Sequence, residues 1–559
     1  MSFDLTTVCC KRVAILLSAG LCSSLFAQSA YDDAIESAKP PRELQTSPKE
    51  LVIEQSNEAL VLDDSEKLFI KGFVVEGALE GDSFEEILTP YKNRELSMRD
   101  INEAALKVAK YYIDQGYLTA VAFTPKQSVK NDTLTIQVVI GKYGKVSYDN
   151  TSPVTNFVVK TSLEKSLKSG AYVTSASLER AMLLIDDMAG AGLPTVIILE
   201  GKEFGSSDFD FSVGSENRFG GYITGDNYGS RLTGKYRVSA GVDINSPLKL
   251  GDKLSFSGLK GKDLQNGRAA YAFPLYSNGL KGEISIEKTD YELGQEYRDL
   301  EAVGDARTLS AGLSYPIIRT QYENLYVSAG FAQRDMEDRI KVLDITIPKE
   351  INVASLGISY EAYTTIFGLN AFVVADGTFN AGRLKIEDEV QNELNKNGAN
   401  TVGDYQKFDI SLLSSVALSE SFTLNTNVRA QKALKSKNLD ASEQISITGI
   451  GGVRGFPDAE YSADSGFAAG AELNYKLPQF IGISHNIGVF FDVGRGFVED
   501  RDYGAAPKSR TLGDVGLSYY VKYKSFFAKA QAANIVGKEN VLSQEDYNTR
   551  YLLQTGATF

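Results

Sequence analysis

The chain has 559 residues, a formal net charge of −14, and 43% hydrophobic against 23% charged residues. This acidic balance argues against a nucleic-acid-binding protein, because such proteins present basic surfaces. A single histidine, His485, excludes any metal or catalytic site that needs two. All three cysteines lie within the first 22 residues, so the rest of the chain has no thiol for a disulfide or a metal.

The N-terminus has the layout of a secretory signal peptide. Lys11 and Arg12 precede a short apolar run that ends at the small residue Ala27. The run is too short to cross a bilayer and leads directly into a polar stretch. Cys22 would also suit a lipoprotein, but Leu21 stands where such a site has a small residue. We therefore expect cleavage after Ala27 and export of a mature chain without cysteine.

A short apolar-polar alternation recurs from about residue 217 to the C-terminus. It is clearest in 422–431, 467–477, 487–494, 515–523 and 551–559. Strands of outer-membrane barrels alternate in this way, with one face toward lipid and the other toward the lumen. A soluble β-sandwich gives the same pattern, but the chain ends on an aromatic residue, Phe559, as outer-membrane barrels do. About 340 residues at roughly twenty per strand and turn predict about sixteen strands.

Residues 66–214 contain two copies of one α+β unit. The first copy has predicted strands at 68–77, 117–123 and 134–139 and helices at 83–91 and 97–116. The second has strands at 143–148, 195–200 and 207–213 and helices at 154–168 and 174–189. Such a tandem arrangement is an internal repeat. The preceding polar residues predict a short helix over 31–39 and then a flexible linker.

This order of parts resembles the transporters of two-partner secretion (TpsB type, the haemolysin/haemagglutinin-activator family). Local matches are Gly116-Tyr117 leading into Pro125, the exit of the first repeat at 139–142, and the segments 226–234 and 245–252. The most specific match is Val453-Arg454-Gly455-Phe456, which resembles the VRGF/Y signature of the superfamily. It is paired with Phe491-Asp492-Val493-Gly494, which looks like the aspartate-containing strand motif.

The resemblance implies two α+β POTRA modules followed by a 16-stranded antiparallel transmembrane β-barrel. The expected parts are a signal peptide (1–27), a plug helix and linker (28–65), POTRA 1 (66–142), POTRA 2 (143–214) and the barrel (215–559), with a lumenal lid loop at about 432–465. The barrel would lie in the outer membrane of a Gram-negative bacterium, with the POTRA modules in the periplasm. The helix at 31–39 occupies the place of the family's pore plug.

The function implied by the resemblance is that of a translocation pore. POTRA modules would recognise a TpsA-type exoprotein in the periplasm, and the pore would secrete it unfolded. That partner could be an adhesin, a haemolysin or a contact-dependent toxin. Other expected partners are outer-membrane lipid, lipopolysaccharide and the barrel-assembly machinery, for which Phe559 would be the signal. A barrel-assembly factor and a passive porin are the alternative functions; the former usually carries five POTRA modules.

The residue pattern also indicates how the two motifs could meet. In 487–494 the apolar residues at odd positions would face lipid, which places Asp492 and Gly494 on the lumen side. The lid loop is long, and long loops are often functional. A contact between Arg454 and Asp492 would be charge-assisted and would act as a latch. The alternative is a solvated loop arginine and an ordinary strand-end aspartate.

The second α+β unit is the predicted site of client binding. An unfolded client can add a strand to an exposed sheet edge, and the family analogy favours the helix–strand groove of POTRA 2. Its expected lining is Leu183, Leu184, Met188, Val196 and Ile198, most of which are also core candidates.

No nucleophile elbow, Walker loop or metal-ligand spacing occurs in the sequence. We therefore expect no enzymatic activity and no cofactor.

Overall fold

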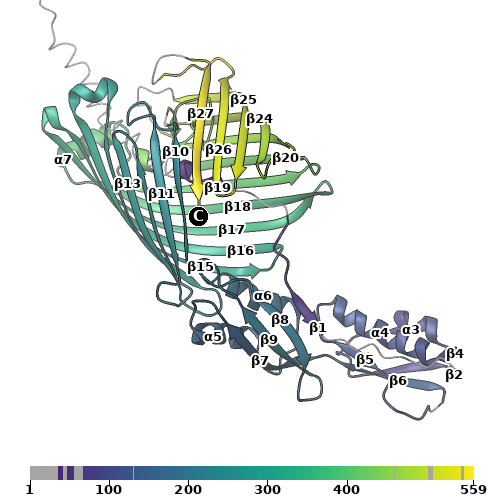
Figure 1. The fold of residues 1–559 in the computed structure, drawn as a ribbon. Coiled ribbons are helices and arrows are strands. Elements are labelled where there is room, and N and C mark those ends of the chain that lie inside the picture. The colour runs from purple at the N-terminus through teal and green to yellow at the C-terminus, as the bar shows by residue number, and fades with distance from the viewer. Residues whose placement is uncertain are drawn as a thin grey trace, which may run out of the picture.

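The fold was determined as a computed structural model that describes residues 36–41, 47–55, 67–129, 131–458, 460–500, 508–542 and 547–559. The predicted signal peptide lies outside the described residues. Two small α+β modules lie in a row at one end of a large barrel, and the second is next to the barrel (Figure 1). None of the helices in the described ranges is long and apolar enough to cross a membrane.

The first module is built around one amphipathic helix, α4 (Met98–Asp114). Ser97 and Asp100 form a capping box at its start, so the first backbone N–H groups are satisfied. Its buried stripe consists of Ile101, Ala104, Ala105, Val108, Ala109 and Tyr112. This stripe packs on the sheet β3 (Gly72–Glu76), β6 (Thr133–Val139) and β5 (Val121–Phe123), in that order.

The predicted strand at 68–77 is wrong as a single element. It is split into β2 (Lys67–Ile70), which pairs with β4 (Arg94–Ser97), and β3, which pairs with β6. The break lies at Lys71, whose N–H donates to the carbonyl of Asp132. The predicted helix at 83–91 is a four-residue α3 (Glu85–Leu88) followed by the 3-10 turn η2 (Thr89–Tyr91).

The second module repeats the pattern with one addition. Its elements are β7 (Lys142–Asn150), α5 (Asn156–Ser166), α6 (Ser175–Asp186), β8 (Thr195–Glu200) and β9 (Ser206–Val213). The sheet order is β1-β8-β9-β7, so β1 (Ile53–Gln55) is an added edge strand, parallel to β8. The prediction of a flexible linker is therefore wrong at these residues. Without β1, the edge of β8 would present unpaired backbone N–H and C=O groups, and β1 pairs with these groups.

The barrel closes between β10 and β27 and contains sixteen antiparallel strands, which confirms the predicted fold class. The strands are β10 (Phe219–Asp226), β11 (Arg237–Asn245), β12 (Lys253–Lys260), β13 (Leu264–Pro274), β14 (Lys281–Glu292), β15 (Ala302–Arg319), β16 (Glu323–Ile340), β17 (Ile345–Ile366), β18 (Leu369–Ile386), β19 (Gly403–Ala417), β20 (Phe422–Ala433), β23 (Ser465–Lys476), β24 (Ser484–Phe497), β25 (Ser509–Tyr523), β26 (Phe526–Ile535) and β27 (Thr549–Thr558). The short β21 and β22 belong to the lid loop.

Alternation along these strands divides the outer from the inner face. In β24, Val489 and Phe491 are 53% and 49% exposed, whereas Phe490 and Asp492 are 1% exposed. Every second residue therefore faces the surrounding medium, as expected for strands in contact with lipid.

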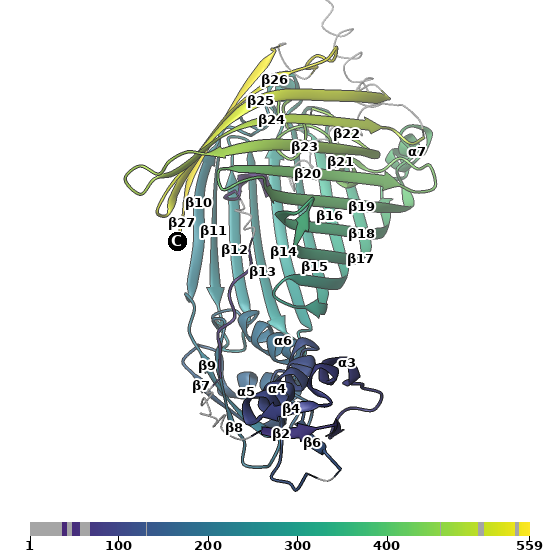
Figure 2. The same cartoon turned by 90° about the vertical axis from the view of Figure 1, so that its right-hand side faces the viewer.

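The second module is joined to the barrel through α6 and the turns at the near end of the barrel. Asp187 accepts from the Arg319 guanidinium at 2.8 Å, and its backbone carbonyl accepts from Lys281 at 3.0 Å. Arg180 donates to the carbonyl of Pro316 at 2.9 Å. In both views α6 lies at the module-side end of β15 (Figures 1 and 2). These contacts mark this end of the barrel as the one that faces the modules.

Candidate functional site: the lid loop in the barrel lumen

The lid loop lies between Ala433, the last residue of β20, and Ser465, the first of β23. It is more ordered than a structureless loop. It contains a 3-10 turn, η5 (Ala441–Glu443), and a two-stranded ladder of β21 (Ile445–Ser446) and β22 (Ser462–Ala463). Its buried apolar residues include Leu439, Ile447, Val453, Phe456 and Tyr461. The loop therefore has a packed core of its own within the barrel.

The tip of the lid loop places Arg454 against the lumen wall. Its Nε lies 2.7 Å from Oδ2 of Asp492, and its Nη2 lies 2.9 Å from Oδ1. The pair is therefore bidentate, the geometry in which a guanidinium binds a carboxylate most strongly. The structure thus brings together the two motif residues that the sequence singled out. Arg454 lies on the lid loop and Asp492 lies on β24.

A third residue, Glu472 of β23, completes the contact. Its Oε2 accepts from Nη1 of Arg454 at 2.7 Å. The sequence reasoning missed Glu472, although the alternation in 467–477 had assigned it to the lumen face. It is the one acidic residue on that face of the segment. A search for lumen-side carboxylates would have found it.

Neighbouring groups fix the orientation of the guanidinium. The Phe490 ring lies with its centroid 3.5 Å from Cζ of Arg454, a cation–π contact. The N–H of Gly455 donates to Asp514 of β25 at 2.5 Å. Burial by itself lowers the pKa of Arg454, but the hydrogen bonds and attraction from Asp492 and Glu472 raise it above its ordinary value. The side chain therefore stays charged while buried.

The remaining motif residues have separate roles. Val453 and Phe456 are fully buried in the core of the loop. Gly494 leaves room for this core, because a Cβ there would stand 2.6 Å from Cγ2 of Ile447. Phe491 is different: it is 49% exposed on the outer face, so it does not contribute to the lumenal contact.

A second charged cluster, which the sequence reasoning did not foresee, holds the stem of the lid loop, defined here as residues 439–443. Glu443 contacts Arg334 of β16 and Lys407 of β19, each at 3.1 Å. Asp440 lies 3.6 Å from Lys349 of β17, whose side chain is fully buried. These cations sit on strands far from the loop in sequence, so no local pattern connects them to it.

Apolar packing supports the stem as well. Leu439 is 3% exposed and packs in one cluster with Met336, Ile351, Leu384 and Tyr405 from the same region of the wall. The lid loop is thus held along its length. Its stem is held by β16 to β19 and its tip by β23, β24 and β25. Its returning part is held by Arg550 of β27, which donates to the carbonyl of Phe456, and by Arg510 of β25, which pairs with Glu460.

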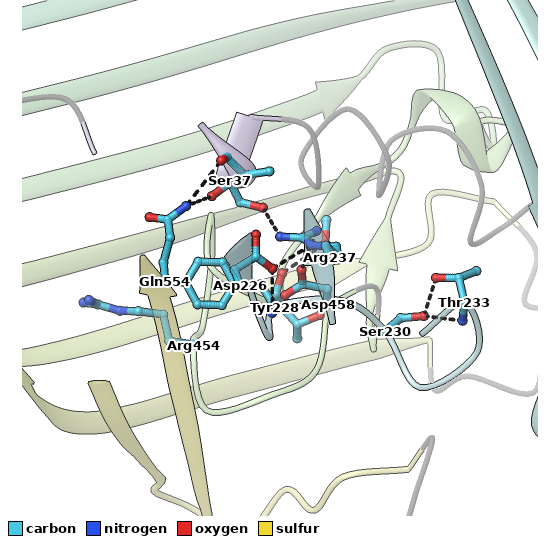
Figure 3. Close-up of polar contacts among 12 residues, drawn as sticks. Ser37, Asp226, Tyr228, Ser230, Thr233, Arg237, Arg454, Asp458 and Gln554 are labelled. Atoms are coloured by element: carbon cyan, nitrogen blue, oxygen red, sulfur yellow. Dashed lines mark hydrogen bonds and ion pairs between the residues drawn. The ribbon is translucent and has the colours of Figure 1, made fainter. Parts of the chain in front are cut away.

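An N-terminal segment also lies in the lumen. Residues 36–38 are helical, and Ala38 is fully buried. Its carbonyl accepts from Thr224 at 2.6 Å, while Arg237 and Gln554 donate to the hydroxyl and the carbonyl of Ser37, each at 3.1 Å. Figure 3 shows Ser37 beside Arg237 and Gln554, which come from opposite ends of the barrel sequence.

The residues predicted to line a client-binding groove are buried. Leu183, Leu184, Met188, Val196 and Ile198 are at most 7% exposed, and the last three belong to the core of the second module. Leu184 and Met188 line a pocket with the barrel turns at 250–251 and 274–281, whereas Val196 and Ile198 pack inside the module. The backbone edge of β8 beside them is paired with β1.

The C-terminal residue closes the barrel seam. Phe559 exchanges two backbone hydrogen bonds with Gly221 of β10, at 2.9 and 3.0 Å. Its ring is 66% exposed. A role of Phe559 as an assembly signal stays a prediction.

Two modules, a closed barrel and a lumenal lid loop together define an outer-membrane protein transporter of the POTRA–barrel class. Residues 205–515 match the family of haemolysin secretion/activation proteins ShlB/FhaC/HecB, and residues 68–141 match the ShlB-type POTRA domain. The chain belongs to this family, whose members are outer-membrane transporters of two-partner secretion. The barrel accordingly lies in the outer membrane and the POTRA modules in the periplasm.

Individual relatives are distant in sequence but extend over most of the chain. The heme/hemopexin transporter protein HuxB of Haemophilus influenzae (strain 86-028NP) is 26% identical over 74% of this chain and 73% of its own length. The hemolysin transporter protein HpmB of Proteus mirabilis is 24% identical over 78% and 77%. The solved structure of CdiB from Escherichia coli has a TM-score of 0.69 at 19% identity, covering 97% of this chain and 98% of that chain.

The assembly-factor alternative is supported only at the level of fold. A structure of BamA from Haemophilus ducreyi that lacks POTRA domains 1-3 has a TM-score of 0.52 at 13% identity, covering 88% of this chain and all of that chain. Such a likeness shows the shared architecture. The family match favours protein secretion over barrel assembly.

Proposed function

We propose that this chain exports one dedicated protein, a TpsA-type exoprotein, from the periplasm to the cell surface. The second POTRA module captures the unfolded client, and the lid loop and the N-terminal segment close the pore until export begins. The observation that carries the proposal is the bidentate contact of Arg454 with Asp492 inside the lumen, backed by Glu472.

The anchors of the lid loop make it a gate with defined positions. The charged contacts at the tip and at the stem are both buried in the barrel lumen. If one side chain of such a contact is removed, the charge of the other is left poorly solvated. The loop therefore favours one arrangement strongly over intermediate ones, and export requires the tip contacts to be released as a unit. The N-terminal segment, held through Ser37 and Ala38, is a second obstacle that has to leave.

The capture site we propose is the edge of β8. An extended client can pair with this edge by strand addition, which uses backbone groups and tolerates many sequences. Because β1 already pairs with Val196, Ile197 and Ile198, a client strand has to replace it. The buried residues beneath β8 then shape the sheet and do not contact the client. Barrel lipid, lipopolysaccharide and the machinery that inserts the barrel are further partners under this proposal.

Weakening β1 tests the capture site directly. The substitution Glu54→Pro removes a backbone N–H from the middle of β1, so the edge of β8 opens. With a few backbone hydrogen bonds at about 0.5–1.5 kcal/mol each, client affinity should rise by roughly tenfold. The measurement is binding of an unfolded fragment of the client to the full chain in detergent.

Glu50→Pro is the matched control, because residue 50 precedes β1 and pairs with no strand. It should leave client affinity unchanged. Equal affinity of the parent chain and Glu54→Pro would place capture elsewhere. In that case the free edge of β5 in the first module becomes the next site to examine, since β5 is an edge strand of its sheet.

A further inference from the structure

Two tight turns of the barrel have an unusual composition. Phe367-Gly368 connects β17 to β18, with φ of 51° and 80°. Ile481-Gly482 lies between β23 and β24, with φ of 49° and 75°, closed by mutual hydrogen bonds of Phe480 and Ile483. Positive φ at both central positions is the type I′ arrangement, for which Asn-Gly and Asp-Gly are the favoured pairs.

The left-handed backbone conformation disfavours large side chains, and β-branched ones most of all. Among the described residues, the other non-glycine positions with positive φ are all polar or charged. They include Asn93, Asp344 and Lys524. Phe367 and Ile481 are therefore the two apolar exceptions, and both stand at the outermost position of a turn.

No side-chain packing among the described residues compensates for this strain. Phe367 is 99% exposed and Ile481 is 76% exposed, and the adjacent Phe480 is 65% exposed. In water these apolar side chains would gain nothing from their position. An unfavourable conformation persists where it serves a purpose, so the compensating contact has to come from outside the chain.

The position of the turns identifies that contact. Both lie at the end of the barrel that faces the modules, because β10 leaves the second module and strands alternate in direction thereafter. They are away from the turns at 246–252, 275–280 and 320–322, which lie beside the second module. On the outer face, β23 and β24 carry Tyr475 and Ile487 beside the second turn, and β17, which leads to the first turn, carries Leu356 and Ile358, all of them exposed. The apolar turn tips thus continue the lipid-facing band of the barrel.

We propose that the turns formed by Phe367-Gly368 and by residues 480–482 insert into the periplasmic leaflet of the outer membrane. Their side chains would lie at the boundary between headgroups and acyl chains, where aromatic and aliphatic side chains anchor proteins. They would anchor the part of the barrel wall that lies away from the second module. The two turns then oppose tilting of the barrel when a client pulls on the module side.

The sequence provides a clean probe, because the chain contains no tryptophan. Phe367→Trp and Ile481→Trp, made one at a time, place a single fluorophore at each turn. The proteins are reconstituted in phosphatidylcholine vesicles whose lipids carry bromine either near the headgroup or near the chain ends. Leu517→Trp, on the outer face of β25, serves as the deep control, and Phe204→Trp, in an exposed turn of the second module, as the water control.

Insertion predicts emission blue-shifted from that of Phe204→Trp, weak quenching by aqueous iodide, and stronger quenching by bromine near the headgroup than by bromine near the chain ends. Leu517→Trp should show the opposite order for the two bromine positions. If both turn variants emit and quench like Phe204→Trp, the turns face water or a protein partner and the proposal is wrong. Heat-modifiable migration of each variant confirms that the barrel is folded before fluorescence is compared.

Discussion

The variant Arg454→Ala should insert into the outer membrane as a heat-modifiable barrel but export its client poorly. Removal of the guanidinium leaves Asp492 without its hydrogen-bonded cation and leaves Glu472 to the nearby charge of Lys529. Breaking a buried pair in this way costs about 3–5 kcal/mol, which corresponds to roughly a hundredfold or larger loss in occupancy of the tip position. The loop then samples many lumenal positions, including ones that obstruct the path of the client, so export falls although the pore has lost its defined closed state. The measurement is the amount of client in the medium relative to the cell.

Arg454→Lys is the matched comparison. A lysine keeps the charge but cannot donate to Asp492 and Glu472 with the planar fork of arginine. We expect export between that of the parent and that of Arg454→Ala. Barrel folding should be normal in both, because the strand pairing of the wall does not involve Arg454. Normal client levels from Arg454→Ala would contradict the latch.

The second large effect concerns the stem. Glu443→Gln removes the charge that Arg334 and Lys407 share, and both cations lie partly buried beside it. We expect the stem to loosen and the conductance of single pores in planar bilayers to increase. Arg454→Ala alone should change conductance less, because the stem still holds the loop in the lumen. The combined variant should conduct more than the sum of the two single effects predicts, since the two contacts hold one loop.

Asp305→Asn provides a control on the same barrel. It breaks a pair with Arg339 in which both side chains are more than one third exposed, and exposed pairs contribute about 0–1 kcal/mol. Its conductance should match that of the parent. Strictly additive effects of Glu443→Gln and Arg454→Ala would show that tip and stem are independent and would contradict a gate that moves as one unit.

The barrel and the inward orientation of Asp492 could be predicted from sequence because both depend on local regularities. Alternation of period two identifies barrel strands, and the same parity turns Asp492 inward. The family resemblance of residues 453–456 then identified Arg454 as the partner of Asp492, which lies far from it in sequence. The size of the wall followed from the length of the alternating region.

The missed features depend on contacts between segments far apart in the chain. Lys349, Lys407 and Arg334 are scattered along three strands, and only closure of the barrel brings them to Asp440 and Glu443. β1 was missed because three residues carry too little periodicity, and its pairing is set by the free edge of β8.

Whether the chain serves one client is tested most directly by deleting it and taking a census of proteins in the culture medium and the outer membrane. The account predicts that one large protein disappears from the medium while other outer-membrane barrels stay at normal levels, and that the full chain restores it. A general fall of outer-membrane barrels, or an unchanged medium, would contradict dedicated secretion.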